Sequence, residues 1–335
     1  EAAKILSSAE NLVVFYGSDG MGLPQTCAAA GMIAEGLVKT DHFGRANNGL
    51  IPVWMHANDQ GAFELGLQPD PALVESISDT MGLYILGADP AGDDPALKNA
   101  IQKAGCVIVH DLFLTETAKL ADVVFPAQAV MERDGSLVSG ERRVQKLGAA
   151  VPAPKDTRAD HTISAALLEK LGGEVLPGAP AELFDLIVKT EPGFTTLSFE
   201  KLGETHAQWP LVGRNEVYYG GTGYDNTYGL GVVLPLAAGE TELPHKCTMP
   251  ETIKPAKTNW LALPVTRLYA QSMATKMSLL KDRIPAEAVM MHPSDASGLK
   301  LEDSAEVTLK FDNLELNAMV KLNPDQPKGV ILVAR

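Results

Sequence analysis

Short apolar runs of strand length alternate with helix-like segments in the first part of the chain, and this alternation restricts the fold more than any other feature. The apolar runs are residues 11–16, 82–86, 106–110 and 122–125, and the helix-like segments are residues 22–37, 95–103 and 116–120. Uninterrupted apolar runs are typical of strands buried on both faces, as in parallel sheets. Strand, helix and strand joined by short loops form right-handed crossover units. The pattern predicts an α/β fold with a Rossmann-like parallel-sheet body.

The last part of the chain differs in both charge and periodicity. Residues 255–335 carry 10 basic and 9 acidic side chains, whereas residues 1–254 carry 18 and 33. Strand candidates in this part are residues 259–265, 305–311, 314–322 and 330–334, and Asp312-Asn313 is predicted to join two of them as a hairpin. We therefore expect a small, closed or partly closed C-terminal β barrel.

These changes predict three parts: an α/β body over residues 1–190, an extended connection over 191–254 and the β-barrel module over 255–335. The connection is rich in Gly, Pro and Tyr and lacks periodicity. Within the body, residues 131–145 are expected to form a hairpin that turns at Asp134-Gly135. Residues 157–171 are expected to form a helix capped by Asp156 and ended by Gly172.

Charge and cysteine content exclude several classes of protein. The chain has 28 Lys plus Arg and 42 Asp plus Glu, a net charge of −14, and such a surface repels nucleic-acid phosphates and anionic lipids. Its apolar runs are too short to span a bilayer, so we expect no direct membrane insertion. Cys27, Cys106 and Cys247 lie far apart, which leaves no CxxC pair for zinc or an iron–sulfur cluster and indicates a reducing compartment.

Polar residues follow two of the predicted strands, where parallel sheets bind ligands. Gly87 and Asp89 come after the strand at residues 82–86, and Asp111, Thr115, Glu116 and Thr117 come after the strand at residues 106–110. Asp111 and the residues at 115–117 offer oxygen atoms to the hydroxyl and N–H groups of a ribose or guanine. The competing interpretation is helix capping by Asp89 and Thr115, which physical chemistry alone favours slightly.

Other candidate motifs are weaker. Residues 17–22 lie between a strand and a helix but lack the GxGxxG spacing, and residues 220–231 lack the GK[ST] ending of a phosphate loop. Ion pairing on the hairpin is favoured over acid–base chemistry for its charged residues, which are Glu132, Asp134, Glu141, Arg142 and Arg143. The seven histidines show no HxH or HExxH spacing. The residues alone therefore identify no catalytic constellation.

Several segments, in this order over nearly the whole chain, resemble the molybdopterin oxidoreductase superfamily. They are residues 49–66, 111–126, 131–145, 198–210 and 285–304. Residues 131–145 (MERDGSLVSGERRVQ) are similar to the superfamily's E-x-D-G-T-x-x-N-x-E-R-R-x-Q hairpin, and residues 285–304 are similar to its C-terminal dinucleotide-binding barrel. The resemblance implies that the loops carrying Gly87, Asp89, Asp111, Thr115, Glu116 and Thr117 are cofactor loops for molybdopterin guanine dinucleotide.

Three departures imply that the fold is retained and the cofactor site is lost. Trp54 stands where formate dehydrogenases carry an arginine at the molybdenum, and one indole N–H cannot replace a guanidinium fork. The barrel's T-G-R loop is represented by Val265-Thr266-Arg267, and the hairpin asparagine is Ser139. We expect Trp54 to be packed against neighbours and to fill space that a cofactor or substrate would occupy.

This combination resembles the family of the large iron–sulfur subunit of respiratory complex I, the NADH-quinone oxidoreductase. The resemblance implies a cofactor-less structural part of the peripheral arm, with iron–sulfur clusters confined to an N-terminal portion outside this chain. It also implies other peripheral-arm subunits as partners, a cytoplasmic location at the inner face of the cell membrane, and no catalysis by this chain alone. The alternatives are part of an active molybdopterin oxidoreductase, such as a formate dehydrogenase, and a stand-alone nucleotide-binding module.

Overall fold

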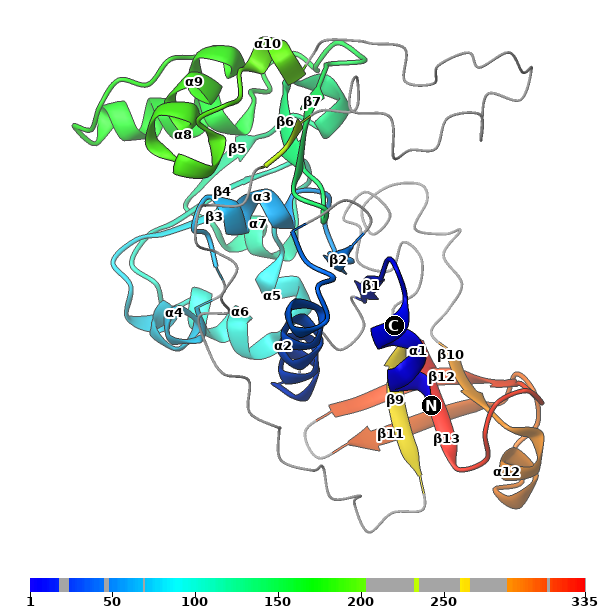
Figure 1. Ribbon diagram of the computed structural model, residues 1–335. Helices are drawn as coiled ribbons and strands as arrows, with labels where there is room; N and C mark the ends of the chain where they lie inside the picture. The colour runs from blue at the N-terminus through cyan, green and yellow to red at the C-terminus, as the bar shows by residue number, and fades with distance from the viewer. Residues whose placement is uncertain are drawn as a thin grey trace. The chain divides into compact units, whose positions relative to one another are not determined.

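The computed structural model describes residues 1–17, 24–44, 48–68, 70–202, 232–234, 260–265, 288–311 and 314–334 (Figure 1). The chain forms two compact units, one within residues 1–249 and the other within residues 250–335. The three-part division expected from the sequence stays a prediction, because most of residues 191–254 lie outside the described ranges.

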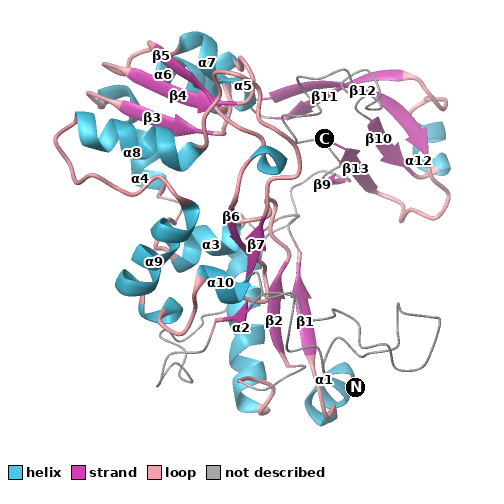
Figure 2. Cartoon of the chain, turned by 90° about the horizontal axis from the view of Figure 1, so that it is seen from above, coloured by secondary structure: helices cyan, strands magenta, loops and turns pink. Residues whose placement is uncertain are grey.

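A three-stranded parallel sheet carries the predicted ligand edge in the first unit. Its strands are β3 (Leu83–Leu86), β4 (Val107–Asp111) and β5 (Val123–Pro126), paired in that order. Helices α5 (Pro90–Asp93) and α6 (Pro95–Ile101) connect β3 to β4, and α7 (Glu116–Leu120) connects β4 to β5. Figure 2 shows these helices gathered on one side of the sheet. The predicted α/β pattern is confirmed here, with boundaries within two residues for strands and helices.

Alternation along β4 gives the sheet two different faces. Val107 and Val109 point to the helices α5–α7 and form a buried core with Ile85, Ile101 and Ala118. The neighbouring His110 points to the opposite face, since successive side chains of a strand alternate. There it meets α8 (Asp160–Lys170) through polar contacts. One face is thus closed by apolar packing and the other by polar contacts.

Two further sheets complete the described part of the first unit. Strands β1 (Val13–Tyr16) and β2 (Gly49–Pro52) pair in parallel across α2 (Pro24–Lys39). Strands β6 (Gly135–Val138), β7 (Arg143–Leu147) and β8 (Val232–Val233) form an antiparallel sheet. The remaining helices of this unit are α1 (Ala2–Ser8), α3 (Asp59–Glu64), α4 (Pro71–Ser76), α9 (Pro180–Thr190) and α10 (Phe199–Leu202).

The predicted hairpin forms, but its turn is not where the dipeptide signal placed it. The turn lies at residues 139–142, where Arg142 donates its backbone N–H to the carbonyl of Ser139 over 2.8 Å and has a positive φ of 61°. Gly135 instead begins β6, and the Asp134 carboxylate just before it accepts the backbone N–H of Ala149. The tertiary hydrogen bond outweighs the local turn preference.

The helix predicted at residues 157–171 is confirmed as α8, but its predicted cap is wrong. The residue before the helix is Ala159, and Asp156 lies outside with a φ of 70°. The C-terminal end agrees with the expectation, since Gly172 has a φ of 83°, which favours glycine. Before α9, residues 179–180 follow the same uncapped pattern, with Ala179 at the cap position.

Part of the predicted connection is packed rather than merely extended. Phe194, Leu197 and Leu202 are buried in one cluster with Phe184 of α9 and Val144 of β7. Residues 191–202 therefore hold the β6–β7 hairpin against α9 by apolar burial, which stabilises by about 25 cal/mol per Å².

The second unit is an open, curled sheet in its described residues rather than a closed barrel. Strands β9 (Leu261–Val265), β10 (Ala288–Met291), β11 (Glu306–Phe311), β12 (Leu314–Leu322) and β13 (Val330–Ala334) pair in the order β11-β12-β10-β13-β9. No pairing between the outer strands β11 and β9 is seen among these residues. The sequence missed β10 and the short helix α12 (Pro293–Gly298), which pack Val289, Met291 and Ala296 into the core.

Some sequence-based predictions fall outside the described residues. These are most of the loop at residues 17–22, the glycine-rich stretch at 220–231 and the Asp312-Asn313 turn. The strands on either side of that turn do pair antiparallel, with Phe311 opposite Leu314. None of the helices within the described ranges has the length and apolar character that a membrane crossing requires.

The contact between the β6–β7 turn and β2 yields a prediction. A Cβ atom at Gly140 would lie 2.3 Å from the carbonyl oxygen of Pro52, whereas a Cβ at Gly148 would meet no atom within 4 Å. Gly140→Ala should therefore lower the free energy of unfolding by about 1–3 kcal/mol through overpacking. Gly148→Ala, the matched control, should not, and thermal melting of both variants measures the difference. Equal melting temperatures would contradict the close approach of turn and strand.

Candidate functional site

The carboxyl ends of β3 and β4 bring the predicted loop residues together at one edge of the sheet. The backbone N–H of Gly87 bonds the carbonyl of His110 over 2.9 Å, which continues the pairing of β3 with β4 to the start of the loops. Gly87 has a φ of 57°, and a Cβ atom there would meet nothing within 4 Å. The first loop therefore turns sharply beside open space.

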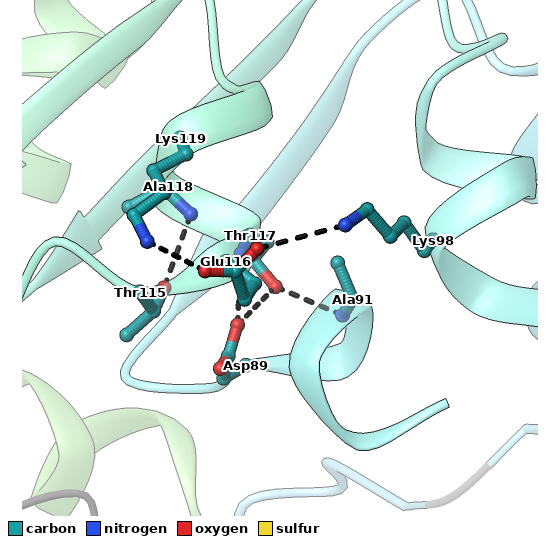
Figure 3. A network of polar contacts seen from close by, with 8 residues as sticks. All are labelled: Asp89, Ala91, Lys98, Thr115, Glu116, Thr117, Ala118 and Lys119. Atoms are coloured by element: carbon teal, nitrogen blue, oxygen red, sulfur yellow. Dashed lines mark hydrogen bonds and ion pairs between the residues drawn. The ribbon is translucent and has the colours of Figure 1, made fainter. Parts of the chain in front are cut away.

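A buried hydrogen-bond network ties the two loops to each other (Figure 3). One carboxylate oxygen of Asp89 accepts both the backbone N–H and the hydroxyl of Thr117, each over 2.8 Å. The hydroxyl oxygen of Thr117 in turn accepts the backbone N–H of Ala91 over 2.9 Å. Both residues are almost fully buried. Asp89 is therefore a structural link between loops, and it does not cap α5, contrary to the competing interpretation.

Close packing around Asp89 depends on a residue that the sequence reasoning missed. A Cβ atom at Gly92 would lie 2.1 Å from the second carboxylate oxygen of Asp89. Glycine at this position lets α5 approach the carboxylate. The local signal is a glycine three residues after Asp89, inside a short helix where glycine is otherwise unfavourable.

Thr115 and Glu116 have local roles in α7. Thr115 is fully buried and caps the helix, its hydroxyl oxygen accepting the backbone N–H of Ala118 over 3.0 Å. Glu116 lies on the surface between Lys119 and Lys98, and its hydrogen bond with Lys119 lowers the pKa of its carboxyl. The capping interpretation is thus supported for Thr115, and Glu116 is occupied by two lysines.

Asp111 differs from the other loop residues because one of its oxygens is left open. It is 6% exposed, and its Oδ1 accepts the backbone N–H of Phe113 over 3.1 Å. Its Oδ2 is buried and has no hydrogen-bond partner among the described residues. Burial raises the pKa of the Asp111 carboxyl, and the nearby charge of Asp89 raises it further, against the lowering effect of backbone N–H groups. A buried acceptor without a donor is costly and calls for an explanation.

The charged hairpin residues serve structure in the described part of the chain. Glu132 accepts the backbone N–H of Ala129, and Arg143 pairs with Glu141 two residues away. Arg142 reaches across to α3 and bonds both carboxylate oxygens of Glu64, over 2.8 and 3.1 Å. These contacts, rather than acid–base chemistry, account for the charges.

Trp54 also contacts α3. Its ring stacks on Phe63 with centroids 5.0 Å apart, and its indole N–H donates to Gln60 over 2.9 Å. Gln60 donates to Glu64, the partner of Arg142. Trp54 is thus packed, as expected, but it is only half-buried, so the idea that it fills a cofactor's space stays a prediction.

The described residues contain no group of three or more His, Cys, Asp or Glu side chains that converge as metal ligands. The predicted site is therefore reduced to one open acceptor, Asp111, beside the positive-φ turn at Gly87. Asp89, Thr115 and Thr117 support it by fixing the loops.

The hydrogen bonds of the Thr117 hydroxyl can be tested by removing that hydroxyl. Thr117→Val keeps the shape but removes a donor to Asp89 and an acceptor for Ala91, so it should destabilise the chain by about 1–3 kcal/mol. Thr190→Val, in the exposed last turn of α9, is the matched control and should change stability little. Denaturant unfolding of both variants measures the two effects. A Thr117→Val variant as stable as the control would show that the loops are held by other means.

Comparison with known proteins places this site in a family. A family model described as molybdopterin oxidoreductase matches residues 3–170, which include every residue of the site. In fold, the chain resembles acetylene hydratase from Pelobacter acetylenicus, with a TM-score of 0.54 at 18% identity, covering 79% of this chain and 39% of that one.

Two of the curated relatives are alpha subunits of oxidoreductases. F420-dependent formate dehydrogenase 1 subunit alpha of Methanococcus maripaludis is 26% identical over 99% of this chain and 54% of its own length. NADPH-Fe(3+) oxidoreductase subunit alpha of Geobacter sulfurreducens is 26% identical over 98% of this chain and 39% of its own length. The chain thus spans about half or less of these relatives, which are not named as complex I subunits. On the matched half of its sequence and on its fold, the chain belongs to the molybdopterin oxidoreductase family.

Proposed function

We propose that the chain is part of the cofactor-binding subunit of a multi-subunit molybdopterin oxidoreductase of the formate dehydrogenase kind. The observation that carries the proposal is the buried, open Oδ2 of Asp111 at the carboxyl edge of the sheet. The curated relatives, which are alpha subunits, support the presence of partner subunits. These observations favour the alternative drawn from the sequence over the cofactor-less interpretation.

The chemistry of Asp111 fits the nucleotide end of molybdopterin guanine dinucleotide. A carboxylate accepts hydrogen bonds only, and guanine N–H groups or ribose hydroxyls are the donors that such a cofactor brings. The turn at Gly87 leaves room for the ligand to approach the backbone. When bound, the cofactor supplies two-electron redox chemistry at its metal. The residues of this chain bind and orient its nucleotide end, and the Asp89–Thr117 link keeps both loops in place.

The Asp111 carboxylate should lower the stability of the ligand-free chain at neutral pH, although it provides an acceptor for a ligand. Because burial raises the pKa of Asp111 above the ordinary value of 3.8, the folded chain binds this proton more tightly than the unfolded chain. Stability therefore falls as pH rises from about 4 through the raised pKa, and the charge is a cost at neutral pH. Asp111→Asn should raise the melting temperature of the ligand-free chain at pH 7, while Glu169→Gln on the exposed part of α8 should not.

The same variant tests binding. GDP serves as a probe of the nucleotide end in calorimetric titrations of the purified chain. Loss of a charge-assisted hydrogen bond should weaken its affinity by about 10- to 100-fold in Asp111→Asn, with Glu169→Gln unchanged. A higher melting temperature together with unchanged GDP affinity would mean that Asp111 is strained for another reason.

A second candidate is the cofactor-less structural part of NADH-quinone oxidoreductase, peripheral to the cytoplasmic face of the membrane. Trp54 favours it, because a stacked indole stands where formate dehydrogenases are expected to carry arginine. Elemental analysis for molybdenum and tungsten, with fluorescence of the released pterin, separates the two. Metal and pterin in the protein purified from a cofactor-producing host support the first candidate. Their absence from a normally folded protein that also fails to bind GDP supports the second.

A further inference from the structure

A polar cluster around the buried His110 lies on the sheet face opposite α5–α7, and its other members, Tyr84, Arg133, Asp160 and Ser164, are partly exposed. His110 of β4 is 1% exposed. Its Nδ1 lies 3.2 Å from the hydroxyl of Tyr84 on β3, and that hydroxyl lies 3.0 Å from the hydroxyl of Ser164 on α8. Its Nε2 lies 3.0 Å from a carboxylate oxygen of Asp160, the first residue of α8. Asp160 also contacts the guanidinium of Arg133.

Apolar packing contributes little to the docking of α8. Ile163 is the one residue of this helix that is fully buried. An eleven-residue helix is marginal by itself in water, so its position depends on tertiary contacts. Three of those contacts run through the cluster: Ser164 to Tyr84, Asp160 to His110, and Asp160 to Arg133. The polar cluster therefore supplies three of the contacts that hold α8 on the sheet.

The cluster is consistent with a neutral imidazole. With its proton on Nε2, His110 points an N–H group toward the Asp160 carboxylate, and its Nδ1 accepts a hydrogen bond from the Tyr84 hydroxyl. The 3.0 Å contact to Asp160 is electrostatic, because the Nε2 atom has no aligned hydrogen-bond partner among the described residues. The edge-on ring contact with Tyr84, with centroids 5.6 Å apart, fixes the imidazole plane.

We propose that Tyr84, His110, Arg133 and Asp160 form a clasp that docks α8 on the β3–β4–β5 sheet and releases it in mild acid. No part of this proposal depends on cofactor binding at Asp111. The clasp is a conformational device on the other face of the same sheet.

Burial and the charges that face His110 determine whether docking of α8 strengthens or weakens as pH falls. Burial lowers the pKa of His110, and the positive charge of Arg133 lowers it further, while Asp111 raises it. The Asp160 carboxylate, 3.0 Å from Nε2, also contacts the guanidinium of Arg133. The docked form therefore takes up the proton less readily than the released form, so docking is strongest above pH 6.5 and weakens as pH falls below it.

Hydrogen exchange on the intact chain tests the clasp. Exchange of the α8 amides is measured between about pH 7.5 and 5.5 and corrected for the intrinsic rate at each pH. Protection of α8 should fall by up to about tenfold per pH unit, the limit for uptake of one proton. Protection of α6, on the opposite face, should stay constant. Constant protection of α8 over this range would overturn the proposal.

Two variants assign the effect to His110. His110→Gln keeps a polar side chain that cannot be protonated, so protection of α8 should no longer depend on pH. His161→Gln changes a less buried histidine on α8, which contacts the carbonyl of Gly178, and should respond like the parent. Loss of the pH dependence in His161→Gln, but not in His110→Gln, would refute the assignment.

A measurement on the parent covers the case in which His110→Gln does not fold. The imidazole of His110 is titrated by NMR in the parent chain, with the less buried His161 as the reference. A midpoint below 6.5 for His110 supports the clasp, and a midpoint at or above 6.5 rules it out.

Discussion

The Asp89 carboxylate, which binds the backbone and hydroxyl of Thr117 inside the protein, is the interaction on which the edge of the sheet depends. A buried charge is tolerated only when hydrogen bonds surround it, and here the donors come from the loop after the neighbouring strand. The link joins two loops that are 28 residues apart in sequence. It also explains why Gly92 lies against the carboxylate, since any side chain there would displace α5.

Asp111 differs from Asp89 in its hydrogen bonding. Both carboxylates lie at or just after the carboxyl end of a strand and both are buried, but Asp89 accepts two hydrogen bonds from Thr117, whereas the buried Oδ2 of Asp111 has no donor among the described residues. Fixed loops beside an unsatisfied acceptor are the arrangement expected of a preorganised binding edge. We expect the open acceptor to weaken the ligand-free chain, as is common at functional sites.

The two faces of the β3–β4–β5 sheet are closed by different forces. Val107 and Val109 bury apolar surface under α5–α7, and that packing does not respond to pH. On the other face, His110 meets Asp160 and Tyr84 with little apolar support. The strand period of two places these residues alternately, so neighbours in sequence belong to surfaces of different character. The carboxyl edge of the sheet, which carries Asp111, lies where the two faces meet.

The sequence by itself determined the βαβ order, the strands of the second unit except β10, and which loops form the edge. Periodicity and glycine positions are local, so they could be read directly: α7, β12 and β13 begin and end at the predicted residues. The resemblance to the family also came from local motifs in a fixed order, and the family match confirms it. A sequence pattern cannot predict which hydrogen-bond partner each polar group has in the folded protein.

Only the tertiary structure decided those partners. It assigned Asp89 to Thr117, Glu116 to Lys98 and Arg142 to Glu64, and it left Asp111 open. It also moved the hairpin turn away from Asp134-Gly135, because a hydrogen bond to Ala149 outweighed the local preference. A residue's type fixes which bonds it is able to make. Its burial and the groups that other segments bring within about 3 Å decide which of those bonds form.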